Sequence, residues 1–429
     1  MSAIGAKSLR IAWLGPAPAE GGGVPGVNTE LLDGLARLGH RIDCFFPSSG
    51  QKLPARLIEN PNLEFVWGTS EWQWDRWYSR SRITAFASGM VARGYSSVRL
   101  RQKIAEAHRR EPYDVVYQFS SIESLSVPVA VTRSVPLVIH PETHSAGELR
   151  ALIAERGVSR RCEPGYRFAS ALAIMLARTL VQRVRIRRAK LLICISGVFR
   201  DHLVRDYGFP RESTVVVANP VRLERFAIHP TARAGVPTVL VLGRIAVRKG
   251  VEDVVAVAQT LRDRGVRVNI RVVGGPSLWS DYSRLLEDLP PETSEYVGAL
   301  PAAEIPDELQ RTDVLLQASH YEPFALTVAE ALAAGVPVVA TSEVGAIEGV
   351  DRAVLGEVAP GDIERMADAL VEMLGRVERE PAQTAERARA EAERLFDPDV
   401  ICARLSTALE TLVSGGTRDD AGATAVARP

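Results

Sequence analysis

The chain has 429 residues, of which 46% are hydrophobic and 24% are charged, and its formal net charge is zero. This composition excludes a wholly disordered or membrane-embedded chain, and the length predicts two domains with separate hydrophobic cores. The charge is divided unevenly, because residues 1–225 hold 32 Lys and Arg against 20 Asp and Glu, whereas residues 226–429 hold 20 against 32. We therefore expect the two halves to contact different partners.

The cysteines and the apolar runs indicate the compartment. The four cysteines stand far apart, without a Cys or His neighbour at metal-site spacing: Cys44, Cys162, Cys194 and Cys402. They predict neither a zinc site nor a disulfide framework, which favours a reducing, cytoplasmic location. The sequence starts without an apolar run of signal-peptide length, and its longest apolar run, residues 168–177, is far shorter than the ~20 residues of a membrane-spanning helix.

Strands and helices are predicted to alternate in the first half. Residues 11–15 and 42–46 are predicted strands, and the amphipathic helix between them, residues 28–38, completes a βαβ unit with parallel strands. Four further strands are predicted at residues 115–119, 136–140, 191–195 and 214–217. The pattern stops at Asn219 and Pro220, and residues 221–236 are interpreted as a linker.

A second series of the same kind follows the linker. It comprises predicted strands at 238–243, 268–273, 314–317 and 336–341, a helix over 250–264 and another that opens near Thr327. The fold class is therefore α/β, with two doubly wound parallel sheets in tandem. We assign residues 1–220 to an N-terminal domain, 221–397 to a C-terminal domain, and 398–413 to a helix that packs back toward the N-terminal domain. Residues 414–429 are predicted to be disordered.

Two motifs are placed where phosphates bind in such sheets. The glycine-rich GGGVPG at 21–26 lies between the first strand and the first helix, where backbone N–H groups and the helix dipole can receive a phosphate. On shape alone, a plain tight turn is an equal interpretation. The segment VLGRIAVRKG, 241–250, ends the first strand of the second half, so Arg244 and Lys249 could both reach an anion there; the alternative is a solvated basic turn.

The segment SHYEPFALTVAEALAAGVPVVATSEVG, 319–345, gives the strongest signal. Glu322 follows a predicted strand and Glu330 lies in the next helix, and carboxylates are usual readers of sugar and ribose hydroxyls. Between them, Phe324, Ala325 and Leu326 should present helix-start N–H groups to a diphosphate. The simpler interpretation makes Glu322 a charge at the helix start and Glu330 a surface residue.

In this order and spacing, GGGVPG, VLGRIAVRKG, VVGGPS (272–277), EYVGALP (295–301) and EPFALTVAEALAAGVPVVA resemble the GT-B glycosyltransferases of family 4. The resemblance runs from residue 9 to about residue 413. Glu322 and Glu330 reproduce the family's E-x7-E motif, and VVVANPV (215–221) resembles its interdomain segment. The fold implied is GT-B, in which two Rossmann-like domains face each other across a cleft.

The resemblance implies roles for the donor side. Arg244 and Lys249 would neutralise the diphosphate, Glu330 would hold the ribose and Glu322 the donor sugar. The loop of Gly22 and Gly23 would close on the phosphates from the other domain, and Gly274 would line the donor site with its backbone. The family implies retention of anomeric configuration and no divalent metal or other cofactor, because the cations and amides stabilise the leaving diphosphate.

A family histidine that faces the donor sugar falls within PLVIHPETHSAGE, 136–148. On that alignment His144 takes the place of the final histidine and is the catalytic candidate beside Glu322. Glu142 stands where many members keep their main histidine, and His140 is interpreted as a strand residue; both are assigned to the acceptor side. Ala325, where the family usually has Gly, is interpreted as a departure that a helical backbone tolerates.

The N-terminal half has a basic and aromatic character that suits the acceptor. Residues 150–190 carry 11 Lys and Arg against two Asp and Glu. Trp72, Trp74 and Trp77 lie beside Arg residues and are assigned to the acceptor side. Such a surface suits anionic lipid headgroups, a phosphorylated or lipid-linked acceptor, or nucleic acid. A solvated Arg-rich helix face is an equal interpretation of 150–190, and a core or pocket lining the commoner one for the tryptophans.

The function predicted is transfer of a hexosyl group from a UDP- or GDP-linked sugar to a hydroxyl of a lipid, glycan or natural-product acceptor. Its partners would be the nucleotide-sugar donor, the hydroxyl acceptor and, peripherally, an anionic membrane at its inner face; no nucleic acid is expected. The alternatives are a nucleotide-sugar epimerase or a phosphorylase on the same fold, and a non-catalytic module that binds nucleic acid or membrane.

Overall fold

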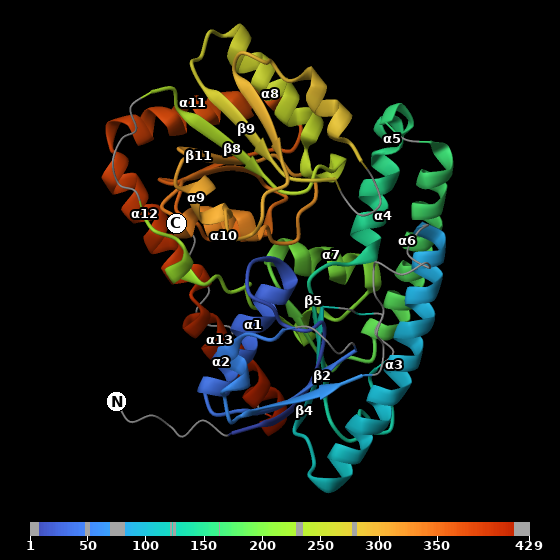
Figure 1. Cartoon of the computed structure of the whole chain (residues 1–429). Coiled ribbons are helices and arrows are strands. Elements are labelled where there is room, and N and C mark those ends of the chain that lie inside the picture. The colour runs from blue at the N-terminus through green and yellow to red at the C-terminus, as the bar shows by residue number, and fades with distance from the viewer. Residues whose placement is uncertain are drawn as a thin grey trace.

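The computed structural model describes residues 8–47, 52–68, 82–120, 122, 126–162, 164–228, 235–276 and 281–415. They form two α/β lobes, one above the other in Figure 1, with most of the N-terminal half of the chain below and most of the C-terminal half above. Trp72, Trp74, Trp77 and residues 416–429 lie outside the described residues, so the predictions made for them stay predictions.

The N-terminal domain contains a seven-stranded parallel sheet in the order β3-β2-β1-β4-β5-β6-β7. Its strands are β1 (Arg10–Leu14), β2 (Arg41–Phe46), β3 (Leu63–Trp67), β4 (Val115–Ser120), β5 (Leu137–Pro141), β6 (Leu191–Cys194) and β7 (Thr214–Val216). The helices among them are α1 (Gly23–Arg37), α2 (Ala55–Ile58), α3 (Arg82–Arg110), α4 (Ser145–Ala154), α5 (Arg156–Cys162), α6 (Gly165–Ile186) and α7 (Gly197–Tyr207).

The C-terminal domain contains a six-stranded parallel sheet in the order β10-β9-β8-β11-β12-β13. Its strands are β8 (Thr238–Leu242), β9 (Asn269–Val273), β10 (Ser294–Gly298), β11 (Val314–Gln317), β12 (Val338–Thr341) and β13 (Leu355–Val358). Its helices are α8 (Val251–Asp263), α9 (Ile305–Leu309), α10 (Leu326–Ala333), α11 (Ile363–Arg379) and α12 (Pro381–Phe396).

Burial on both faces explains why the central strands are continuous apolar runs. All four residues of β6, β11 and β12 are buried, as parallel sheets with helices on both sides require. Within the first sheet the rings of Trp13 and Tyr117 stack at 4.2 Å between β1 and β4. The predicted fold class, two parallel-sheet α/β domains, is confirmed.

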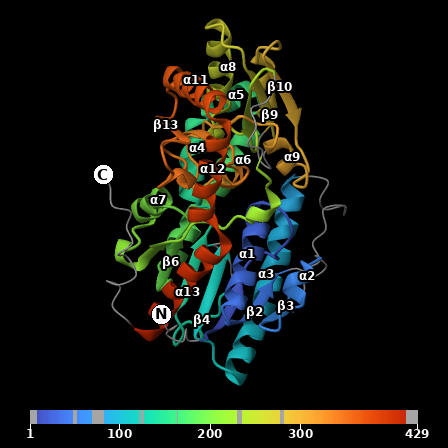
Figure 2. The ribbon, with the colours of Figure 1, turned by 90° about the vertical axis from the view of Figure 1, so that its left-hand side faces the viewer.

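The last helix, α13 (Pro398–Ser414), leaves the C-terminal domain and packs against α1 of the N-terminal domain (Figures 1 and 2). The two helices approach closely at Gly34, where a Cβ would lie 2.3 Å from Cys402 Sγ. The buried His40 Nε2 lies 2.7 Å from Ser406 Oγ, which adds a polar contact to the same surface. The chain therefore crosses between the lobes twice, once near Pro220 and once near Asp397.

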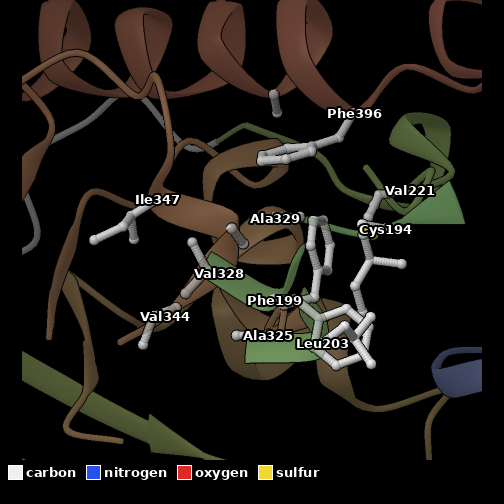
Figure 3. Packing of buried hydrophobic residues seen from close by; sticks show 14 of the residues in the cluster. Cys194, Phe199, Leu203, Val221, Ala325, Val328, Ala329, Val344, Ile347 and Phe396 are labelled. Atoms are coloured by element: carbon white, nitrogen blue, oxygen red, sulfur yellow. The ribbon is translucent and has the colours of Figure 1, made fainter. Parts of the chain in front are cut away.

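An apolar interface joins the two domains. Cys194, Phe199 and Leu203 from β6 and α7 lie beside Ala325 and Val328 at the start of α10 (Figure 3). Phe396, from the end of α12, lies over the same cluster and contacts Phe324 edge-on at 5.6 Å between ring centroids. The amino end of α10 is thus packed against the N-terminal domain.

Candidate active site

The carboxyl ends of β8 and β11 bring the predicted charged residues together. Lys249 ends a 3₁₀ turn, η4 (Val247–Lys249), that follows β8, and Glu322 lies in the loop between β11 and α10. The Lys249 ammonium contacts Oε2 of Glu322, and Arg248 Nη1 lies 3.3 Å from the same oxygen. The side chains of Lys249 and Glu322 are only 16% and 12% exposed, so this ion pair is partly desolvated.

The charges of this cluster support each other. Burial alone would raise the pKa of Glu322, but Lys249 and Arg248 outweigh it and hold that pKa below its ordinary value. Burial lowers the pKa of Lys249, against the opposing effect of Glu322. Glu322 is therefore an ionised carboxylate that can accept hydrogen bonds from a polyol. Sequence reasoning did not name Arg248, although it is adjacent to Lys249 in the motif.

Arg244 provides a second positive charge at this edge. It follows β8, its side chain is exposed, and it lines a pocket together with Gly243, Lys249 and Gln317. Its guanidinium makes no hydrogen bond or ion pair with any other residue that the structure describes. Arg244 and Lys249 thus lie in one pocket, with Arg244 available to an anion.

The amino end of α10, just after the loop that contains Glu322, leaves backbone N–H groups without acceptors among the described residues. The helix begins at Leu326, and the N–H groups of Leu326 and Thr327 have no acceptor among the described residues, as helix starts leave them. Ala325 precedes the helix with φ 79° and ψ 83°. The interpretation that a helical backbone tolerates Ala325 is therefore wrong, because the residue is the left-handed cap of α10, where glycine is favoured.

The glycine-rich loop reaches the other domain. Gly22 is the cap of α1, and a Cβ there would lie 3.0 Å from Oε1 of Glu330 on α10. Burial raises the pKa of Glu330 to about 7, although Arg225 opposes the shift. Glu330 is half-buried rather than a surface residue, and it lies opposite Gly22, the cap of α1. The helix begins at Gly23, earlier than the predicted start at residue 28, so most of the GGGVPG motif forms its first turn.

Gly274 lies next to this pocket, directly after β9. A Cβ on Gly274 would lie 1.6 Å from the carbonyl oxygen of Gly243, so only glycine lets the two backbones meet there. Tyr296 donates a hydrogen bond of 3.0 Å to the Gly274 carbonyl. The segments 241–250 and 272–276 therefore meet at the carboxyl ends of β8 and β9. Phe324, in contrast, is buried in the interdomain core.

His144 is completely buried and both its ring nitrogens are engaged. Nε2 lies 2.8 Å from Asp206 Oδ2, and Nδ1 lies 2.5 Å from the hydroxyl of Tyr321. His144 therefore contacts the residue before Glu322, across the domain boundary. Burial lowers the pKa of His144, against the effect of Asp206.

His140 and Glu142 form a separate buried group at the end of β5. Nδ1 of His140 lies 2.6 Å from the Tyr117 hydroxyl, and Glu142 accepts a hydrogen bond of 2.7 Å from Asn219. Burial lowers the pKa of His140 to about 3 and raises that of Glu142 to about 7. Nε2 of His140 and Oε1 of Glu142 lie 3.7 Å apart, and neither has a hydrogen-bond partner in the part of the chain that the structure describes.

Two groupings of acidic or histidine residues have metal-like spacing. His144, His202 and Asp206 lie within 4.8 Å, but Arg150 places its guanidinium on both Asp206 (2.6 Å) and His202 (3.0 Å), where it supplies the positive charge. The sequence also contains one Asp-x-Asp, Asp397 to Asp399. Asp397 caps α13 and Asp399 pairs with Arg37, so both serve the helix packing.

The two parallel-sheet domains have the GT-B arrangement, and the family models point to the glycosyltransferases. Residues 21–225 match the model described as Glycosyltransferase Family 4, and residues 226–393 match the one described as Glycosyl transferases group 1. The chain belongs to the glycosyltransferases of family 4. The prediction of this family is confirmed.

Relatives and solved structures extend the likeness. A glycogen synthase of Mycobacterium tuberculosis is 32% identical over 216 residues, which are 49% of this chain and 50% of that protein. The chain thus matches about half the length of this curated relative. A sucrose-phosphate synthase from Thermosynechococcus elongatus has a TM-score of 0.69 at 18% identity, over 95% of this chain and 100% of that one. Anabaena HepE, in complex with UDP and glucose, has a TM-score of 0.61 at 19% identity, over 94% and 100%.

Proposed function

We propose that the chain transfers a hexosyl group from a UDP- or GDP-linked sugar to a hydroxyl of a lipid, glycan or natural-product acceptor, with retention of anomeric configuration. Glu322 would accept hydrogen bonds from the donor sugar and Glu330 from the ribose. Arg244, Lys249 and the N–H groups at the start of α10 would hold the diphosphate, and Gly274 would line the site with its backbone.

One observation carries the proposal: the Lys249–Glu322 ion pair lies beside the exposed guanidinium of Arg244. Glu330, on the helix that follows Glu322, faces the glycine-rich loop of the other domain. A nucleotide diphosphate sugar has a diphosphate between the hydroxyls of its ribose and those of its sugar. The cations and amides can bind the diphosphate, and the carboxylates can accept hydrogen bonds from the hydroxyls on either side. The likeness to Anabaena HepE, solved with UDP and glucose, supports the same class of donor.

The chemistry follows from the positive charge. As the glycosidic bond to the phosphate breaks, negative charge grows on the leaving diphosphate, and Arg244 with Lys249 would stabilise it more than they stabilise the ground state. These two cations and the helix-start amides perform the task that a divalent ion performs elsewhere. We therefore expect turnover to be unchanged by a chelator. Because the family implies retention, we also expect the product to keep the anomeric configuration of the donor, as read by NMR.

The test begins with a thermal-shift screen of UDP- and GDP-sugars, followed by hydrolysis of the most stabilising one. Glu322→Gln should lower its turnover by about 100-fold, the range for losing a group that acts in the transition state. Glu372→Gln, an exposed carboxylate on α11, is the matched control and should leave turnover unchanged. Absence of stabilisation by any sugar nucleotide, or full turnover in Glu322→Gln, would contradict the proposal.

We further propose that α6 contacts an anionic membrane. This helix has an exposed apolar stripe that recurs every four residues: Leu176, Leu180 and Val184, which are 47%, 66% and 69% exposed. Apolar side chains that line one face of a helix are usually buried against the protein. Arg183 and Arg187 are exposed next to this stripe. Apolar residues beside cations suit insertion among anionic headgroups. No helix in the described ranges is long and apolar enough to cross a membrane.

Cosedimentation with vesicles tests this contact. The wild type should bind vesicles of 30% phosphatidylglycerol in phosphatidylcholine, a composition chosen for its negative charge, and Val184→Glu should reduce that binding by about tenfold. Ile58→Glu, on the equally exposed Ile58 of α2, is the control. Equal binding to pure phosphatidylcholine, or equal loss in both variants, would contradict a contact through α6.

A further inference from the structure

The loop that contains Glu322 is held on both sides by the N-terminal domain. The residue before it, Tyr321, contacts His144 through its hydroxyl, 2.5 Å from Nδ1. The residue after it, Pro323, accepts a hydrogen bond of 2.8 Å from the hydroxyl of Ser196. Both bonds are buried. The carboxylate assigned to the donor is therefore anchored by the domain opposite the donor pocket.

The direction of the hydrogen bonds follows from the charge on Asp206. Burial would raise the pKa of this carboxyl, but hydrogen bonds from His144, Arg150 and Arg205 hold it well below its ordinary value, so Asp206 is an acceptor only. His144 Nε2 must then carry the proton that Asp206 accepts at 2.8 Å. In a neutral imidazole Nδ1 is left as the acceptor, and Tyr321 donates its hydroxyl proton to it.

The packing around this chain of bonds is close. The imidazole of His144 meets the rings of Phe199, Tyr207 and Tyr321 edge-on, at 5.4 to 5.7 Å between centroids. Gly147, on the first turn of α4, leaves room for Tyr321, because a Cβ there would lie 2.4 Å from the tyrosine hydroxyl oxygen. The His144 ring has a single position in which it serves both Asp206 and Tyr321.

We propose that His144 is a positioning residue that acts through Tyr321 and sets the place of Glu322 in the donor pocket. The inference rests on the proposed function, since it assigns His144 to the same site. The N-terminal domain would thus take part in donor recognition. Glu322 would be correctly placed to bind the donor sugar only when the hydrogen bonds from Asp206 through His144 to Tyr321 are formed across the domain boundary.

The size of the effect follows from the contacts that remain. Without the bond to His144, Glu322 keeps its backbone hydrogen bond to Glu343 (3.2 Å) and its ion pair with Lys249. The loop stays in place, but the position of its Tyr321 end is less tightly fixed. Because a displacement of about 1 Å costs up to about 100-fold in rate, partial loss of precision should cost about tenfold.

The first test is Tyr321→Phe, which removes the hydroxyl and keeps the ring. We expect kcat/KM for the best sugar nucleotide to fall about tenfold, while the Kd of the corresponding nucleoside diphosphate, UDP or GDP, stays within twofold of the wild type. The diphosphate has no sugar for Glu322 to bind, so only a change at Glu322 separates the two values. Tyr113→Phe is the control. Its buried hydroxyl donates a hydrogen bond of 2.5 Å to Asp43, and Tyr113 lies just before the amino end of β4, away from the carboxyl ends of the strands.

The second test uses His144 itself. His144→Asn can place an acceptor near the position of Nδ1 and should retain more sugar-nucleotide turnover than His144→Phe, which has none. Combining His144→Phe with Tyr321→Phe should lower kcat/KM no further than either change alone, because each change removes the same hydrogen bond between His144 and Tyr321. Melting temperatures of all variants identify any that do not fold, and Tyr321→Phe decides the question if His144→Phe is among them.

The outcomes separate this inference from the proposed function. Wild-type kcat/KM in Tyr321→Phe, or equal losses for the sugar nucleotide and the bare diphosphate, would overturn the positioning role. If these results occur while Glu322→Gln shows its expected loss of turnover, the proposed function stands and only the role of His144 fails. If Glu322→Gln is fully active, the proposed function fails first.

Discussion

Gly22 and Glu330 meet across the domain boundary, with Oε1 of the glutamate 3.0 Å from the point where a Cβ on Gly22 would lie. The glycine-rich segment of one domain therefore approaches the α10 carboxylate of the other so closely that a methyl group on Gly22 would make a tight contact with it. In the proposed function this contact brings the loop over the donor.

Gly22→Ala tests this contact. A methyl group there must push the loop away from Glu330 or displace the carboxylate, so kcat/KM for the sugar nucleotide should fall on the order of tenfold, equivalent to about 1.4 kcal/mol. Gly157→Ala, in α5, is the matched control, because nothing lies within 4 Å of a Cβ at that position. Steady-state kinetics of both variants measure the effect, and equal rates for the two would show that the loop does not approach the donor.

The cap of α10 offers a stability test. Ala325 has φ 79° and is buried, and a β-branched side chain is a strong outlier in that region. Ala325→Val should lower the free energy of unfolding by about 2 kcal/mol or more. Ala325→Gly should stay within about 1 kcal/mol of the wild type, because relief of strain offsets the lost methyl group and the greater freedom of the unfolded chain. Urea unfolding measures both, and an unaffected valine variant would contradict a left-handed cap.

The sequence predicted the central strands of both sheets but missed three strands. β3, β10 and β13 lie at sheet edges, and their mixed burial leaves no continuous apolar run to recognise. The charged residues of the proposed donor site could be named because Glu322, Glu330 and Lys249 belong to local motifs. The contact between His144 and Tyr321 joins residues 177 positions apart, and no local pattern records it.

Glu330 should make stability depend on pH. Burial raises its pKa to about 7 from an ordinary value of 4.5, so the folded state binds more protons than the unfolded state between these values. Its contribution to stability is thus present below about pH 4.5 and is lost as the pH rises toward 7. Glu330→Gln removes this dependence.

The measurement is urea unfolding of Glu330→Gln and the wild type at pH 5, 6, 7 and 8, a range chosen to span the titration. The variant should gain stability relative to the wild type as the pH rises. The pH dependence that other buried carboxyls such as Glu142 and Glu155 add is the same in both proteins and cancels in the difference. A difference that is constant from pH 5 to 8 would contradict a raised pKa of Glu330.

Lys249 is expected to act on both the donor and Glu322. Lys249→Ala removes a charge that would neutralise the leaving diphosphate and leaves Glu322 with Arg248 as its remaining cation at 3.3 Å. Turnover of the sugar nucleotide should fall by about 100-fold or more, as for other transition-state charges. The control is Lys190→Ala, which should keep full turnover. Lys190 is exposed and lies just before the amino end of β6, in the sheet of the N-terminal domain. Because the lost charge acts mainly as the diphosphate departs, kcat should fall more than donor affinity, and an unchanged kcat with a raised KM would restrict Lys249 to ground-state binding.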